Sequence, residues 1–141
     1  RLISVVLGAS DDETRSRESQ RLLSYGFRYY DTQTLFKSGE IIESGVKVWY
    51  GKEDFIDLTI KDNATITFPR GAKDNLKAKV SINDTLEAPI STGDELGKLE
   101  IVLDDETLLS VPLISVDEIQ QGNIITRLLD WLVLFFTNLL S

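Results

Sequence analysis

The feature that most constrains the fold is a series of short apolar runs between residues 32 and 115, with turn residues about every 8 to 12 positions. In several runs apolar and polar residues alternate, which places every second side chain on the same face of a strand. The clearest pair, residues 99–103 and 109–113, flanks the acidic tripeptide 104–106. Alternation on both sides of a short turn is typical of a β-hairpin. We therefore predict a small antiparallel β-sandwich over residues 32–118.

Further strands are predicted where short runs rich in β-branched or aromatic residues end at turn residues. They cover residues 46–50, 55–60, 64–68 and 76–82. Because proline lacks a backbone N–H, we expect all three prolines at strand ends or edges: Pro69, Pro89 and Pro112.

The first 31 residues follow a different pattern. A short β-branched run over residues 2–7 ends at Gly8 and predicts a buried strand. Ser10 and Glu13 have the spacing of a capping box and predict the start of a helix. The apolar residues of that helix share one face: Leu22, Leu23, Gly26, Phe27 and Tyr30. A strand and a helix alone bury too little surface to fold, so we expect their packing partners upstream.

Residues 119–141 predict a second helix, with its polar residues on one stripe: Asn123, Thr126, Arg127, Asp130, Thr137 and Asn138. The longest unbroken apolar run, 131–136, is far shorter than the roughly 20 residues that a spanning helix needs. A narrow polar stripe opposite a bulky apolar face is typical of a helix that lies in a membrane interface. We predict that this helix binds a membrane surface through Ile124, Ile125, Leu128, Leu129, Trp131, Leu132, Phe135, Phe136 and Leu139.

Composition excludes several kinds of active site. The 141 residues include no Cys, no His and no Met. Without Cys and His the chain has no thiolate nucleophile, no Ser-His-Asp triad and neither of the usual zinc ligands, so we expect no metal and no cofactor. The net charge of -8 argues against nucleic-acid binding. The lack of Met predicts a processed chain or a piece of a longer protein.

Other candidate sites have simpler structural interpretations. We expect the acidic tripeptide 104–106 to be a solvated hairpin tip rather than a Ca²⁺ site. The glycosylation-like triplets at 63–65 and 83–85 are interpreted as turns. Trp49 and Tyr50 are interpreted as packing residues rather than a platform that stacks a sugar.

Several short runs, taken in their order along the chain, resemble one family of bacterial enzymes. Residues 1–9 and 18–28 resemble the end of its catalytic domain, and the C-terminal tail resembles its membrane helix. The chain also resembles the second, β-rich domain of that family, at residues 46–49, 68–71, 76–78, 88–90, 97–99 and 111–113. The family is that of the low-molecular-mass penicillin-binding proteins, D-alanyl-D-alanine carboxypeptidases of the penicillin-binding protein 5 type in serine peptidase family S11.

The resemblance implies a mainly β fold with flanking helices. Residues 1–31 would be the last strand and helix of an α/β catalytic domain, 32–118 a β-sandwich, and 119–141 an amphipathic membrane-surface helix. The family removes the terminal D-Ala from peptidoglycan pentapeptides through a serine acyl-enzyme. This part would act as spacer and membrane anchor in the bacterial periplasm, at the outer face of the inner membrane. Its partners would be that membrane and, through the upstream catalytic domain, peptidoglycan.

The family's catalytic motifs are S-x-x-K, S-x-N and K-[ST]-G, in that chain order. This chain contains short matches at 37–39, 44–47 and 81–83, but the K-[ST]-G match comes first. S-x-x-K needs both side chains on one helix face, whereas residues three apart on a strand point to opposite faces. Since 44–47 leads into a predicted strand and 37–39 into a turn, we expect no catalytic residue in this chain.

Two alternatives remain open at the level of sequence. The C-terminal helix is also compatible with packing on a protein core or a partner, as amphipathic helices commonly do. The whole chain is also compatible with a stand-alone binding module without an enzymatic parent. In that case the β-sandwich would hold a protein partner and the tail would form part of the interface.

Overall fold

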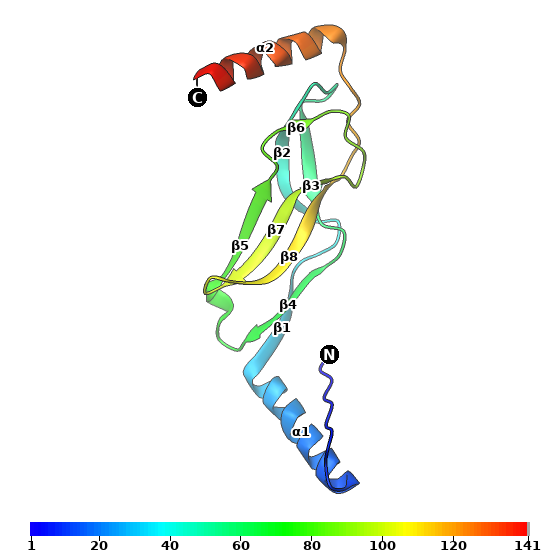
Figure 1. Cartoon of the computed structure of the whole chain (residues 1–141), viewed down its shortest axis with the longest axis vertical. Coiled ribbons are helices and arrows are strands. Elements are labelled where there is room, and N and C mark those ends of the chain that lie inside the picture. The colour runs from blue at the N-terminus through cyan, green and yellow to red at the C-terminus, as the bar shows by residue number, and fades with distance from the viewer. Residues whose placement is uncertain (141) are drawn as a thin grey trace.

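The molecule is elongated, with a helix at each end and strands between them (Figure 1). The computed structural model describes residues 1–140, and the side chains of residues 1–136. The helices are α1 (Asp12–Tyr29), the short 3-10 helix η1 (Lys73–Asn75) and α2 (Ile124–Leu140). The strands are β1 (Tyr30–Phe36), β2 (Ile41–Trp49), β3 (Phe55–Thr59), β4 (Ala64–Pro69), β5 (Leu76–Ile82), β6 (Leu86–Glu87), β7 (Glu95–Leu103) and β8 (Glu106–Ser115). The predicted class, mainly β with flanking helices, is confirmed.

The strands form two sheets. β1 and β4 form a two-stranded antiparallel sheet, and the other strands form a sheet of order β5-β7-β8-β3-β2-β6. The prediction of a purely antiparallel arrangement is wrong at one ladder, because β2 and β6 pair in parallel. Because β3, β4 and β5 lie between β2 and β6 in the chain, these two strands are not joined by a hairpin, which allows this direction.

Both sheets contribute to one apolar core. In β4 buried and exposed residues alternate, and Ala64, Ile66 and Phe68 point inward. Phe68 packs in the same buried cluster as Leu58 of β3 and Leu113 of β8 in the larger sheet. The strand predicted at residues 64–68 is therefore formed, and one of its faces lies on the core.

The β7–β8 hairpin confirms the strongest prediction from the sequence. Leu99 and Ile101 are buried, and Leu103 pairs with Glu106. The turn therefore consists of two residues, Asp104 and Asp105, and Glu106 belongs to β8 rather than to the turn. Both turn residues have positive φ, 45° and 70°. Two consecutive residues with positive φ match the twist of the strands in a two-residue hairpin.

The prolines interrupt few ladder hydrogen bonds. Pro69 ends β4 and Pro89 follows β6. Pro112 lies within β8 and pairs with Lys98 of β7, but the β3 ladder of β8 involves residues 114 and 115. Pro112 therefore lies inside a strand, but at a point where only one side of that strand is paired.

The strand predicted over residues 2–7 is not formed. This segment runs beside α1 without β pairing, and Ile3, Val5 and Leu7 are exposed (Figure 1). A strand needs a partner for its backbone groups, and the described residues provide none here. Leu2 instead lies against α1 at Gly26, where an added Cβ would come within 2.8 Å of the Leu2 Cδ1 atom.

The N-cap of α1 is Asp11, not Ser10 as the capping-box spacing predicted. An Asp11 carboxylate oxygen accepts a hydrogen bond of 2.7 Å from the Thr14 backbone N–H. Ser10 supports the cap, because its hydroxyl donates to the other carboxylate oxygen. A charged carboxylate is a stronger acceptor than a hydroxyl and also interacts favourably with the helix dipole. Tyr30, predicted on the helix face, begins β1 instead.

We predict an acid-labile N-terminus of α1. The Thr14 backbone hydrogen bond, helped by the hydroxyls of Ser10 and Thr14, lowers the pKa of Asp11 below its ordinary value of 3.8. The cap is therefore complete above that value and is lost as the pH falls through the lowered pKa. The Thr14 amide resonance, followed by NMR during acidification, should shift with a midpoint below 3.8. In Asp11→Asn, which caps without titrating, this shift should disappear; an unchanged shift would contradict the assignment.

Arg70 joins α1 to the strands. Its guanidinium donates to the Phe27 carbonyl and to the Asp31 carboxylate, both at 3.0 Å. Its backbone N–H donates to the Tyr29 carbonyl at 2.8 Å. These three contacts fix the C-terminal end of α1 on the β1–β4 sheet.

Candidate functional site

Helix α2 packs on the end of the β domain through its polar side. Thr126, Asp130 and Leu134 are half-buried, and they follow one another at four-residue spacing. They therefore lie on one stripe of the helix. A helix that packs on a protein core normally buries its apolar face. In α2 the stripe toward the β domain instead contains the acidic Asp130, and we call it the charged stripe.

One side-chain contact holds this orientation. An Asp130 carboxylate oxygen accepts a hydrogen bond of 2.7 Å from the Tyr50 backbone N–H. Tyr50 has a φ of 61°, which is uncommon for a residue with a side chain. Its carbonyl accepts a second hydrogen bond, from the Gly122 N–H at 2.8 Å. Tyr50 is thus held from both sides by the segment that contains α2.

The segment before α2 is also tied to the β domain. Gly51 and Gln121 form an isolated antiparallel bridge. The Lys52 ammonium donates to the Gln120 side-chain oxygen at 2.7 Å. These contacts lie just before the first turn of α2, so they fix where the helix begins as well as how it is rotated.

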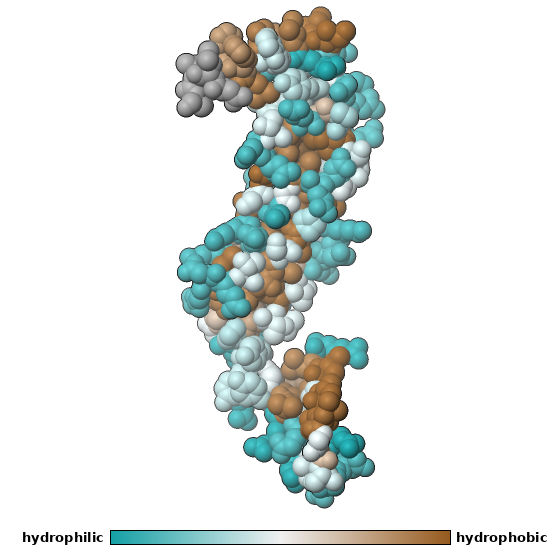
Figure 2. Space-filling model, in the orientation of Figure 1, coloured by the Kyte–Doolittle hydropathy of each residue, from teal (hydrophilic) through white to brown (hydrophobic). Residues whose placement is uncertain are grey.

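The apolar side of α2 points away from the β domain (Figure 2). Among the predicted membrane-binding residues whose side chains are described, Leu132 is the least exposed, at 37%, and Ile124 the most exposed, at 82%. All those whose side chains are described belong to this helix and are exposed: Ile124, Ile125, Leu128, Leu129, Trp131, Leu132, Phe135 and Phe136. Leu139 lies outside the residues whose side chains the structure describes. None of the described helices is long and apolar enough to cross a membrane.

A cavity of about 540 Å³ lies between α2 and the β domain. Its lining combines the amphipathic residues Tyr50 and Trp131 with the charged residues Glu87 and Arg127. Neither the cavity nor the Asp130–Tyr50 contact was predicted, because each joins residues far apart in the chain. The one feature of the sequence that could have indicated the contact is Asp130, the single acidic residue of a mainly apolar helix.

The three matches to catalytic motifs have ordinary structural surroundings. Residues 44–47 lie in β2, where a register shift separates Glu43 from Val46, so Ser44 and Lys47 do not share a helix face. The Lys47 ammonium is paired with the Asp54 carboxylate at 2.7 Å. The Ser38 hydroxyl, in the turn between β1 and β2, donates to the Lys61 carbonyl at 2.6 Å. The third match spans the end of β5 and the residue after it.

The remaining candidates occupy turns and packed strand positions. Residues 63–65 enter β4, where the Asn63 side chain accepts from the Ser38 N–H, and residues 83–85 connect β5 to β6. Trp49 is half-buried, with the Lys47 ammonium 5.1 Å from its ring centre. Among the described residues, no group of three or more acidic side chains is suited to hold a metal ion.

We predict that Asp130→Ala loosens α2 from the β domain without unfolding that domain. The substitution leaves the half-buried Tyr50 N–H without its charged acceptor, a loss of about 1 to 3 kcal/mol in local stability. Hydrogen exchange of the Tyr50 amide should therefore accelerate by roughly tenfold or more. Asp130→Asn keeps a neutral acceptor and should show a smaller effect. Equal exchange in all three proteins would mean that this contact does not position the helix.

The fold and site together define a β-rich domain that carries an amphipathic helix at one end. Residues 30–121 match the family model described as Penicillin-binding protein 5, C-terminal domain. The chain belongs to this family, as the resemblance predicted.

Several relatives match nearly the whole chain. D-alanyl-D-alanine carboxypeptidase DacC of Escherichia coli is 34% identical over 137 residues, which cover 96% of this chain and 34% of that protein. DacA of Haemophilus influenzae is also 34% identical and covers 100% of this chain and 36% of that protein. The structure of penicillin-binding protein 5 from Haemophilus influenzae superposes with a TM-score of 0.77 at 27% identity, covering 82% of this chain and 34% of the other. The chain thus spans about a third of the length of these relatives.

Proposed function

We propose that this chain is the C-terminal part of a serine-type D-Ala-D-Ala carboxypeptidase that trims peptidoglycan pentapeptides. In this proposal it contributes no catalytic residue and serves as spacer and membrane anchor at the outer face of the bacterial inner membrane. The relatives named above are bacterial D-alanyl-D-alanine carboxypeptidases, which supports the parent activity.

The observation that carries the anchor role is the orientation of α2. Its charged stripe is occupied by the β domain, and its apolar residues are exposed together at one end of the molecule (Figure 2). A contiguous exposed apolar surface of this kind is expected of a membrane or partner contact. Because α2 carries one acidic and one basic residue, membrane binding would depend on apolar burial rather than on attraction to anionic lipid.

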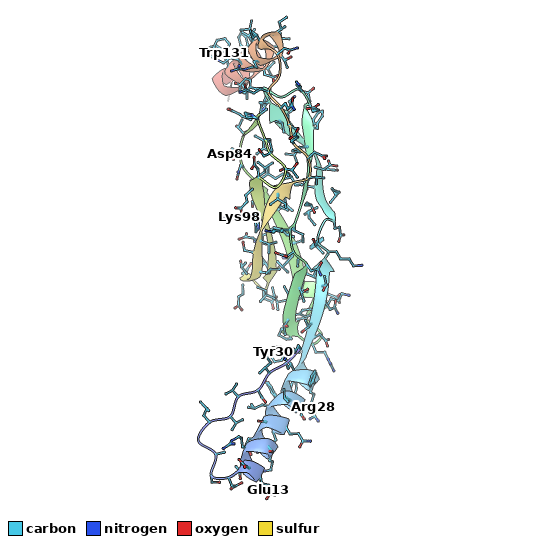
Figure 3. The ribbon with its side chains drawn as sticks, turned by 90° about the vertical axis from the view of Figure 1, so that its right-hand side faces the viewer. Glu13, Arg28, Tyr30, Asp84, Lys98 and Trp131 are labelled. Atoms are coloured by element: carbon cyan, nitrogen blue, oxygen red, sulfur yellow. The ribbon has the colours of Figure 1, made fainter. Side chains whose placement is uncertain are left out.

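The spacer role is supported by the position of the two helices. Glu13 of α1 and Trp131 of α2 lie at opposite ends of the molecule, with the β domain between them (Figure 3). An upstream catalytic domain joined at α1 would therefore be held away from the surface that α2 contacts.

The anchor is tested by deleting residues 122–141 and measuring co-sedimentation with lipid vesicles. The deletion should abolish co-sedimentation, because it removes the exposed apolar residues of α2 and leaves a β domain that buries its own core. Unchanged co-sedimentation would contradict an anchor in α2 and favour the binding module.

The enzymatic parent is tested by labelling membranes of the source organism with a fluorescent penicillin. Peptides such as Leu22–Arg28 should appear in a labelled band larger than this chain. Their presence only in an unlabelled band of this chain's own size would favour the binding module without an enzymatic parent.

A further inference from the structure

The cavity between α2 and the β domain contains two opposite charges that the fold does not use. Glu87, in β6, and Arg127, in α2, both line it. The side chains of these two residues make no hydrogen bond or ion pair with any residue that the structure describes. By contrast, Asp130, the other charged residue of α2, is occupied by the Tyr50 N–H. The cavity therefore presents an acid and a base that are both free to bind a ligand.

The cavity adjoins the exposed apolar residues of α2. A second hollow of about 300 Å³ shares Tyr50, Glu87 and Trp131 with it and adds Phe135. Trp131 and Phe135 are both about half exposed, and their rings stack at 5.6 Å. A ligand in this place would thus contact charged groups at one end and the exposed apolar residues of the helix at the other.

We propose that this cavity binds the headgroup of a zwitterionic phospholipid, one that carries an ammonium group beside its phosphate. The proposal rests on the membrane-surface role of α2. Arg127 is the only cationic residue of the helix, and a guanidinium suits the phosphate. Glu87 and the aromatic faces of Tyr50 and Trp131 suit the ammonium.

The charges in the cavity favour this headgroup over an anionic one. A phospholipid without an ammonium could pair its phosphate with Arg127, but it would place that negative charge near Glu87 and offer Glu87 no cationic partner. The net charge of -8 adds to this repulsion. The acyl chains of a bound lipid would continue along the apolar residues of α2 into the bilayer.

The test measures binding of the 141-residue chain to phosphatidylcholine vesicles and to phosphatidylglycerol vesicles at physiological ionic strength. Glu87→Gln and Arg127→Gln should each weaken binding to phosphatidylcholine by roughly three- to tenfold. Lys98→Gln is the matched control, because it removes an exposed charge from β7, away from Trp131 (Figure 3). It should bind like the unaltered chain. Unchanged far-UV circular dichroism checks that α2 remains folded in each variant.

Glu87→Gln distinguishes a headgroup site from a general effect of net charge on vesicle binding. Removal of one negative charge reduces repulsion from phosphatidylglycerol, so binding to those vesicles should stay constant or rise while binding to phosphatidylcholine falls. If the unaltered chain binds phosphatidylcholine and all three variants bind equally well, the headgroup site is wrong and the membrane role stands. If the unaltered chain binds neither vesicle, both proposals fail.

Discussion

The double substitution Leu129→Asp and Phe136→Asp is expected to abolish membrane binding, with at least about a 100-fold loss of vesicle affinity. Both residues lie outside the charged stripe of α2 and are 58% and 55% exposed. Burial of each side chain in lipid contributes about 1.5 to 3 kcal/mol, and each new carboxylate adds a desolvation cost. Vesicle co-sedimentation gives the affinity.

The matched control adds the same two negative charges elsewhere on the segment. Gln120→Glu and Asn123→Asp change exposed polar residues just before α2, where acidic residues also suit the helix dipole. Glu at position 120 can still accept from the Lys52 ammonium. This protein should bind vesicles within a few-fold of the unaltered chain. Equal losses in the two double variants would mean that net charge, not the apolar side of α2, controls binding.

Phe68→Ala is expected to destabilise the β domain by about 3 to 5 kcal/mol. Phe68 is 1% exposed and lies on β4, in the small sheet, while its buried neighbours include residues of the large sheet. Its truncation leaves a cavity at the junction of the two sheets. Urea unfolding followed by tryptophan fluorescence measures the change in the free energy of unfolding.

Phe55→Ala is the matched control for Phe68→Ala, because it truncates the same type of side chain at an exposed position. Phe55 is 61% exposed, and its ring contacts the Lys47 ammonium at 5.4 Å. Its loss should cost about 1 kcal/mol or less. Similar costs for the two substitutions would contradict a single core shared by both sheets.

The sequence predicted the strands whose pattern is local. β5 has the predicted bounds, and β7 and β8 meet at the predicted turn. Their register follows from one hairpin, which neighbouring residues determine. The strands extend beyond the predicted runs where ladder partners continue the pairing, as at the start of β2.

The missed strands lack this local pattern. β1 forms a backbone ladder with β4, and hydroxyl hydrogen bonds of 2.8 Å join Thr32 to Thr67 and Thr34 to Thr65. One face of β1 is therefore polar, and the strand shows no apolar alternation. β6 has only two residues and is recognisable only from its partner β2. Conversely, residues 2–7 have a strand-like composition but no partner among the described residues. Composition sets the tendency to form a strand, and pairing decides whether it forms.

In the candidate site, too, local features were predictable from the sequence and long-range contacts were not. Helical periodicity predicted which residues of α2 lie opposite the charged stripe, because this depends on the helix alone. The sequence did not predict that the charged stripe is the side of α2 that packs on the β domain. It depends on the contact between Asp130 and Tyr50, which are 80 residues apart. The role of Glu87 in the cavity likewise depends on a connection that brings β6 beside β2.

The depth of α2 in a bilayer tests the membrane-anchor account most directly. Because the chain contains no cysteine, a single nitroxide can be attached through Leu129→Cys or, as the reference, Lys98→Cys. With vesicles present, relative access to oxygen and to a water-soluble nickel complex reports the depth of each label. The account predicts the label at 129 about 5 to 10 Å below the lipid phosphates and the label at 98 in water. Water-like access at both positions would contradict it.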